Sequence, residues 1–294
     1  MKFFLKRSAA GVVFFMGVGA WAQVPGFDPS PGYWARDLQL TGGVLAISPS
    51  GKLAVASDNF AGGASIRIYD RILPEGRTLL HTLSAPNWKF FGGLDWESDS
   101  TLVFTENGDL STALRSDGVT TQLLAPSGSV VAPADIVSLP GQVLVLSAGG
   151  PNQNRLVRIS GQSATVVSPI WGAGFGGGLA VDGDQIFAGD SNDPTFIGQP
   201  GKITPGTATY SGGLVQSVAW QSPWSLAGGG GQGLYSFARD SEGDFLASTG
   251  STLTQLKSGV ASPLGMFTAA FPFPTSLDFL GRASSQGPGQ GCWW

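Results

Sequence analysis

The sequence has almost no cysteine and almost no histidine, and each shortage removes a class of site. Cys292 is the only cysteine among 294 residues, so no disulfide can form within one chain. We expect it to be a free thiol, the alternative being a bridge between two chains. His81 is the only histidine, so a metal site with several histidines cannot form, and any Ser-His-Asp triad would have to use His81. Stability must therefore come from packing rather than from cross-links.

Charged residues are also scarce. They make up 12% of the chain, about half of the usual share of roughly 25%. When Lys2, Lys6 and Arg7 of the N-terminal segment are set aside, 13 Lys and Arg face 20 Asp and Glu, a net charge of about −7. A negative chain argues against a nucleic-acid partner and against binding to an anionic membrane surface. Glycine is abundant, with 45 residues, but 42% of the chain is hydrophobic and alternates with polar residues, so we expect it to fold.

The first 22 residues have the features of an export signal. A basic start is followed by the apolar residues 9–19, and Ala20-Trp21-Ala22 fits the small-x-small rule of signal peptidase. We therefore predict a signal peptide over residues 1–22, one mature domain over residues 23–294, and a secreted or periplasmic protein of the cell envelope. The alternative is a membrane anchor, but the apolar run is shorter than the ~20 residues of a span, so no stable membrane insertion is expected after cleavage.

A two-strand pattern recurs along the rest of the chain. Its clearest copy is GGLAVDGDQIFAGDSN at residues 177–192, where an apolar strand, an Asp/Gly turn and a second apolar strand lead to Asp and Asn. Weaker copies cover residues 43–59, 93–107, 134–149 and 234–250. Their starts lie about 40–57 residues apart, which is the spacing expected of β-propeller blades.

Each repeat can be divided into four antiparallel strands joined by turns rich in Gly, Pro, Asp and Ser. In the first repeat the predicted strands are residues 44–48, 52–57, 65–71 and 77–83. Such a sheet cannot bury both faces alone, whereas radial packing of successive sheets buries them and protects the edges. The sequence therefore predicts an all-β propeller of four-stranded antiparallel blades, most simply six, with five or seven as alternatives.

The chain ends and one internal segment leave the blade count open. Residues 34–40 precede the first repeat as an outer strand would, and residues 276–281 begin an incomplete last repeat. We predict that N- and C-terminal strands share one blade and close the ring. In the fourth repeat, turns are expected at residues 182–184 and at Pro205-Gly206, and residues 214–230 are either a shortened blade or an elaborated connection.

The fourth repeat resembles the NHL-type repeat, whose strand pair ends in an Ala-Asp-like step followed by Asn. The layout of residues 40–265 is similar to the wider six-bladed group of SMP-30/gluconolactonase-like lactonases and streptogramin lyases, and this resemblance implies a propeller fold. The metal-binding Glu, Asn and Asp set of those lactonases has no residue-by-residue match here. The lyases need a catalytic histidine, whereas His81 falls in a predicted outer strand, remote from the channel.

Candidate site residues gather at one predicted rim of the central channel. Because the chain reverses at each strand, the connections between second and third strands share this rim with the connections that lead into each first strand. Carboxylate and amide oxygens suit Ca²⁺ or another divalent cation, and Trp rings can stack on a sugar. The alternative is that Asp and Asn bond to the backbone of their own turns. The ligand-binding candidates are Asp58, Asn59, Asp95, Glu106, Asn107, Asp135, Trp88 and Trp171, and the metal candidates are Asp190, Asn192 and Asp193.

These features predict a binding or scaffolding module rather than a defined enzyme. The expected partner is a polar ligand, a glycan or an envelope protein, and no cofactor is required beyond a candidate divalent cation such as Ca²⁺. The alternative is a divalent-metal-dependent, lactonase-like hydrolase, or a lyase, with its site at the channel mouth. A pair of catalytic carboxylates drawn from Asp95, Glu106 and Asp135 also stays open, because the sequence gives no distances between them.

Overall fold

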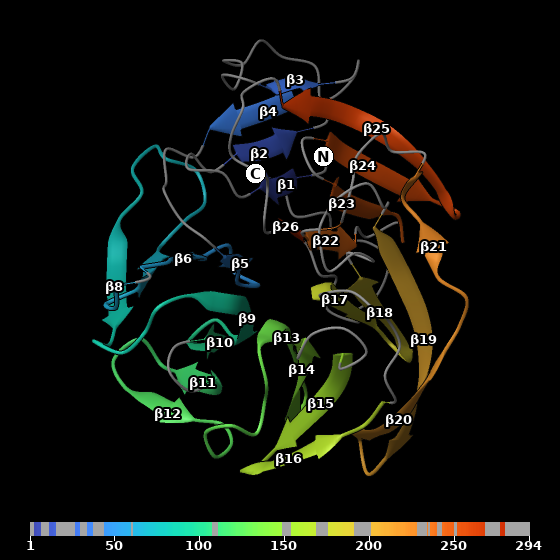
Figure 1. The fold of residues 1–294 in the computed structure, drawn as a ribbon. Coiled ribbons are helices and arrows are strands. Elements are labelled where there is room, and N and C mark those ends of the chain that lie inside the picture. Colours follow the sequence, from blue (N-terminus) through green and yellow to red (C-terminus); the bar gives the residue numbers. More distant parts are fainter. Residues whose placement is uncertain are drawn as a thin grey trace.

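Antiparallel β-strands arranged around one axis make up the computed structural model (Figure 1). Within the described part of the chain, no helix has the length and apolar character that a membrane span needs. The structure describes residues 3–6, 12–15, 27–29, 34–37, 44–59, 61–107, 111–148, 154–168, 176–190, 201–227, 234, 236–239, 243–249, 252–267 and 277–279.

Five consecutive repeats each form a sheet in which strands that follow one another along the chain pair antiparallel. Blade 1 contains β5 (Leu45–Ile47), β6 (Leu53–Ser57), β7 (Ser65–Tyr69) and β8 (Leu79–Ser84). Blade 2 contains β9 (Phe91–Ser98), β10 (Thr101–Asn107), β11 (Ser111–Ser116) and β12 (Thr121–Leu123). Blade 3 contains β13 (Pro133–Leu139), β14 (Gln142–Ala148), β15 (Asn154–Ser160) and β16 (Ser163–Val166).

The last two blades each carry an additional strand. Blade 4 contains β17 (Gly176–Asp182), β18 (Gln185–Asp190), β19 (Lys202–Ser211) and β20 (Leu214–Trp220), and β21 (Trp224–Ser225) also pairs with β19. Blade 5 contains β22 (Ser236–Arg239), β23 (Phe245–Thr249), β24 (Thr252–Lys257) and β25 (Val260–Phe267), with β3 (Phe27–Pro29) on its outer edge. The predicted all-β propeller of four-stranded blades is thus confirmed.

A further sheet, the terminal sheet, combines both ends of the chain. Its order is β26 (Leu277–Phe279), β1 (Phe3–Lys6), β2 (Val12–Phe15) and β4 (Trp34–Asp37). β26 lies beside β22 of blade 5 and β5 of blade 1. Cleavage of the predicted signal peptide stays a prediction, and in the full chain β1 and β2 come from that segment.

The prediction of six blades is wrong in its count, because five repeats form blades within the described residues. Among the described residues, the expected sixth repeat contributes β26, and the other strands of the terminal sheet come from the N-terminal segment. Hydrogen bonds do not close the ring either: among the described strands, no ladder joins the terminal sheet to blade 1 or blade 5. Neighbouring blades are held together by the packing of side chains and by individual hydrogen bonds instead.

The described part of residues 214–230 belongs to blade 4 rather than to another blade, and the predicted turn at Pro205-Gly206 is wrong. Both residues lie inside β19, and the chain reverses later, at Gly212 and Gly213. Pro205 is accommodated because the outer strand is interrupted there: β20 pairs from Gly206 onward, and β21 pairs with Lys202 and Ile203. A residue without an N–H group is tolerated where a ladder is broken.

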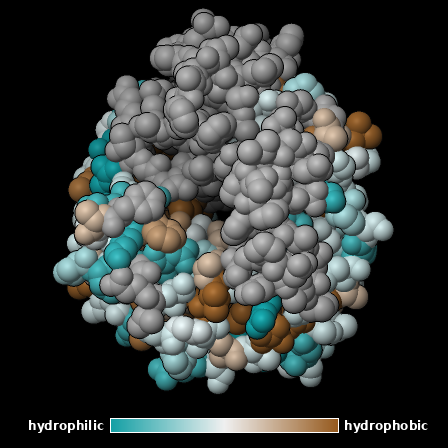
Figure 2. Space-filling model, viewed as in Figure 1, coloured by the Kyte–Doolittle hydropathy of each residue, from teal (hydrophilic) through white to brown (hydrophobic). Residues whose placement is uncertain are grey.

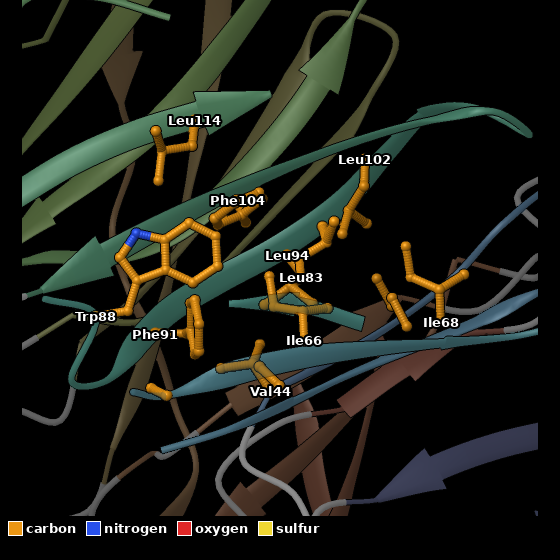
Figure 3. Close-up of a cluster of buried hydrophobic side chains, with 14 of the residues drawn as sticks. Val44, Ile66, Ile68, Leu83, Trp88, Phe91, Leu94, Leu102, Phe104 and Leu114 are labelled. Carbon is orange, nitrogen blue, oxygen red and sulfur yellow. The ribbon is translucent and has the colours of Figure 1, made fainter. Parts of the chain in front are cut away.

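Apolar side chains fill the spaces between successive blades, as the period-two pattern predicts. On β10, Leu102 and Phe104 face blade 1, whereas Val103 belongs to the cluster shared with blade 3. Figure 3 shows the first of these layers, where Ile66 and Leu83 of blade 1 meet Phe104 of blade 2. Full burial of one such side chain contributes about 1.5–3 kcal/mol. Packing between blades therefore contributes substantially to the stability of the ring.

Candidate functional site

The rim predicted to bind a ligand, here called the B–C rim, consists of the connections after β6, β10, β14 and β18 and those leading into β9, β13 and β17. Just below it, the inner strands approach one another closely at glycine. A Cβ atom on Gly92 would lie 1.9 Å from the Pro133 carbonyl oxygen, and one on Gly93 would lie 2.4 Å from Oδ1 of Asp135. These glycines therefore allow β9 and β13 to touch.

Two of the predicted site residues link one blade to the next. Oδ2 of Asp95, on β9, accepts a 2.7 Å hydrogen bond from the backbone N–H of Ser138 on β13. Oδ2 of Asp135, on β13, accepts a 2.7 Å hydrogen bond from the backbone N–H of Leu179 on β17. In each case Oδ1 accepts the N–H of the following residue, at 2.9 Å for Asp95 and 2.8 Å for Asp135. We call this pair the inter-blade carboxylates.

Four more candidates lie at the rim and bond to backbone groups there. Oδ1 of Asp58 accepts the N–H of Phe91 at 3.1 Å, which joins blade 1 to blade 2. Oε1 of Glu106 accepts the N–H of Lys89 at 3.0 Å. The amide of Asn107 donates to the Pro133 carbonyl at 2.9 Å. Oδ1 of Asn59 accepts from the N–H of Ala61 at 3.1 Å, the short-range turn bond that the alternative interpretation expected.

Burial separates these residues into two kinds. Asp95, Glu106 and Asn107 are buried, with side chains held between strands, whereas Asp58 and Asn59 are exposed. A buried carboxylate that accepts N–H hydrogen bonds stabilises the fold, because its desolvation is offset by the donors. Only the exposed residues offer surface to a ligand. Most of the candidate carboxylate and amide groups described here thus form hydrogen bonds within the fold.

Of the aromatic and metal candidates, Trp88 and Asp190 lie among the described residues, and both are buried. Trp88 is 6% exposed and packs edge-on against Phe91 and Phe104, so it presents no open ring face for stacking (Figure 3). Asp190 ends β18 and is buried. Trp171, Asn192 and Asp193 lie outside the described residues, as does Cys292. Within the part of the chain that is described, no three His, Cys, Asp or Glu residues are grouped as a metal site would need.

His81 lies on the outer strand β8, as predicted, and is exposed. Its ring lies over the backbone of blade 2, since a Cβ atom on Gly118 would be 2.9 Å from Cδ2 of His81. Gly118 belongs to the connection between β11 and β12, at the rim opposite the B–C rim. This position separates His81 from the candidate residues near the inner strands.

Sequence reasoning missed an amide that joins blades 3 and 4. The side chain of Gln142 is 3% exposed, donates to the Gly213 carbonyl at 3.0 Å and accepts the Val215 N–H at 3.0 Å. Arg158 adds a 2.6 Å hydrogen bond to the Val215 carbonyl. These contacts satisfy backbone groups of β20. The only signal in the sequence was a Gln directly after a Pro-Gly turn, at the start of an apolar strand.

The opposite rim shows the same use of carboxylates. Asp99, between β9 and β10, accepts the N–H of Ser50 at 2.8 Å and so joins blade 2 to blade 1. Hydrogen bonding from Ser50 holds the pKa of Asp99 below its ordinary value, against a smaller opposing effect of burial. In blade 4, Asp182 pairs with Arg239 of blade 5. Bonds between neighbouring blades are thus found on both sides of the ring.

Two apolar side chains on the B–C rim are exposed, and sequence reasoning did not single them out. Phe90 is 36% exposed and directly precedes β9. Val131 is 56% exposed and lies two residues before β13. Asn107 links the chain segments that carry these two residues. Its backbone N–H donates to the Phe90 carbonyl at 2.8 Å, and its side-chain amide donates to the Pro133 carbonyl. Together with Asp58 and Asn59 they form what we call the Phe90–Val131 patch.

The backbone under this patch is fixed. Oγ of Ser147 accepts the Val131 N–H at 3.0 Å and donates to the Val131 carbonyl at 2.6 Å. The next residue, Ala132, has a φ of 39°, in the left-handed region, at a strain of about 1–2 kcal/mol. Strain held at a surface site is a recognised feature of binding regions. Figure 2 shows hydrophobic and hydrophilic side chains interspersed over blades 2 and 3, in the lower part of the view.

Comparison with known proteins supports the fold and does not extend to function. The chain is similar to a protein of unknown function from Bacteroides caccae, with a TM-score of 0.59 and 10% identity over 95% of this chain and 98% of that one. It is also similar to a gluconolactonase from Xanthomonas campestris, with a TM-score of 0.52 and 17% identity over 89% and 80% of the two chains. No protein-family model and no curated protein matches the sequence. At these identities the likeness shows a shared β-propeller fold alone.

Proposed function

We propose that this protein is an exported β-propeller that binds a polar ligand, a glycan or an envelope protein through the B–C rim. One observation supports a binding surface over a catalytic one: Asp95, Glu106 and Asp135 accept hydrogen bonds from backbone N–H groups, while the exposed apolar side chains Phe90 and Val131 lie on the B–C rim. An apolar surface with a few polar groups at its edge is typical of ligand recognition. The proposal of export rests on the predicted signal peptide. The NHL-type resemblance covers the fourth repeat and supports the fold rather than the ligand.

The Phe90–Val131 patch can be tested with single substitutions. We expect Phe90→Ala and Val131→Ser each to weaken binding about tenfold, because a contact worth roughly 1–2 kcal/mol of apolar burial is lost. Binding would be measured by titration against the strongest hit from a glycan array and from an envelope-extract pull-down. Val119→Ser is the matched control, since Val119 is 81% exposed and lies in the β11–β12 connection, on the opposite rim.

The outcome that contradicts this proposal is equally specific. If the control weakens binding as much as Phe90→Ala does, the patch does not recognise the ligand. Unchanged affinity in both rim variants would also remove this surface as the binding site.

The second candidate is a divalent-metal-dependent hydrolase or lyase at the channel mouth. The observation in its favour is the fold shared with the Xanthomonas campestris gluconolactonase. The two candidates differ in metal dependence. With the inter-blade carboxylates already bonded to N–H groups, we expect millimolar Ca²⁺, Mg²⁺ or Mn²⁺ to leave the melting temperature within about 1 °C of its value in chelator. A rise of several degrees, as expected for a site occupied well above its Kd, would support the metalloenzyme instead.

A further inference from the structure

We propose that β1 and β2 (residues 3–6 and 12–15) are a strand donor within the chain: they fill a gap two strands wide between β26 and β4, and loss of the predicted signal peptide opens that gap. The same residues were assigned from the sequence to a segment outside the mature fold. In the structure they occupy the middle of the terminal sheet. The proposal is independent of what the B–C rim binds, since it concerns a different part of the ring.

The pairing registers define the gap. β1 pairs with β26 through Phe4↔Phe279, Leu5↔Asp278 and Lys6↔Leu277. On its other edge β1 pairs with β2, and β2 pairs with β4 from Val12↔Asp37 to Phe15↔Trp34. β26 and β4 are therefore separated by two strands, a distance of roughly 14 Å at about 4.8 Å per strand step. In this arrangement, removal of β1 and β2 leaves an open edge on β26 and another on β4.

The position of the gap gives it a structural consequence. β26 lies beside β22 and β5, so the terminal sheet stands between blade 5 and blade 1. Blade 1 directs Leu45, Leu53 and Val55 away from blade 2, because their neighbours on the same strands face the cluster shared with blade 2. In the full chain these three side chains are at most 6% exposed. Removal of β1 and β2 would leave β26, the strand of the terminal sheet that contacts β5, without its pairing partner.

The sequence of the donor suits the vacancy. The two strands read FFLK and VVFF, and aromatic and β-branched residues favour strands. Both strands are central in the sheet, so every ladder they make is lost together if the segment leaves. An open pair of strand edges is then available to another apolar hairpin by strand addition.

The first test uses the full chain. Leu5 pairs with both Asp278 and Val13, and Val13 pairs with both Leu5 and Arg36. Proline at either position removes an N–H group and disrupts a central strand. We expect the full chain with Leu5→Pro and Val13→Pro to melt about 5 °C or more below the unsubstituted chain. An unchanged melting temperature would overturn the proposal.

The second test supplies the donor from outside. A chain that begins at Gln23 is titrated with a synthetic peptide of residues 1–16, and the melting temperature is followed. We expect the peptide to raise it saturably toward the value of the full chain, whereas a scrambled peptide and one carrying both prolines leave it unchanged. A truncated chain that already melts with the full chain contradicts the proposal. So does a rise that the scrambled peptide produces equally.

Discussion

The Gly92→Ala variant is expected to lose more than about 4 kcal/mol of its free energy of unfolding, which is exceptional for one methyl group. The added Cβ would lie 1.9 Å from the Pro133 carbonyl oxygen and 2.8 Å from Oγ1 of Thr105. The first contact is with backbone, so no side-chain rotation relieves it. Blade 2 and blade 3 would have to move apart along their inner strands. Urea denaturation followed by tryptophan fluorescence measures the loss.

The control separates this clash from the general effect of replacing glycine. Gly141, in the turn between β13 and β14, has a φ of 74° and no atom within 4 Å of an added Cβ. Gly141→Ala should therefore lose only about 1–2 kcal/mol, from the left-handed backbone conformation. Equal losses in the two variants would show that β9 and β13 do not approach as closely as described.

The second large effect is expected at the inter-blade carboxylates. Asp95→Ala leaves the Ser138 N–H without its carboxylate acceptor, and Asp135→Ala does the same for the Leu179 N–H. A hydrogen bond to a charged group contributes about 1.5–3 kcal/mol, so we expect each variant to lose roughly 2–3 kcal/mol of the free energy of unfolding. The same urea titration measures both variants.

The matched control is Asp184→Ala. Asp184 is also a carboxylate close to a blade's inner strand, but it is exposed in the turn between β17 and β18. Its described side-chain bond is to its neighbour Gln185, at 3.1 Å. We expect a change within about 0.5 kcal/mol, as for ordinary surface substitutions. If Asp95→Ala is as mild as this control, the carboxylate does not hold the blades together.

Much of the fold could be predicted because local signals agree with it. Period-two alternation placed the strands of blade 1 within two residues of their observed ends. The largest differences are at the end of β7, which stops at Tyr69, and at the start of β8, which begins at Leu79. Ser258 and Gly259, with φ values of 50° and 80°, form a two-residue turn between β24 and β25, and Ser-Gly is a dipeptide typical of turns. The dipeptide Pro205-Gly206 led to a wrong turn prediction, because Pro-Gly is typical of turns. It fits inside β19 because the neighbouring outer strand is interrupted there, which the sequence does not reveal.

The candidate site was predictable only in part, because its chemistry depends on pairing between blades. Asp95 and Asp135 fall near the starts of the repeats at residues 93–107 and 134–149, and the structure places them on the first strands of blades 2 and 3. The sequence could not show that the carboxylate oxygens of Asp95 and Asp135 accept hydrogen bonds from backbone N–H groups more than 40 residues further along the chain. Trp88 had equal local reasons to stack on a ligand or to fill the core, and the neighbouring Phe91 and Phe104 decide for the core.

Amide hydrogen exchange at Ser138 and Leu179 tests the central claim most directly, namely that the inter-blade carboxylates Asp95 and Asp135 join neighbouring blades. In the unsubstituted protein both N–H groups should be protected. Asp95→Ala should speed exchange at Ser138 and leave Leu179 protected, and Asp135→Ala should do the reverse. Exchange rates at the two amides that do not respond to either substitution, or that rise together in both variants, would contradict the account.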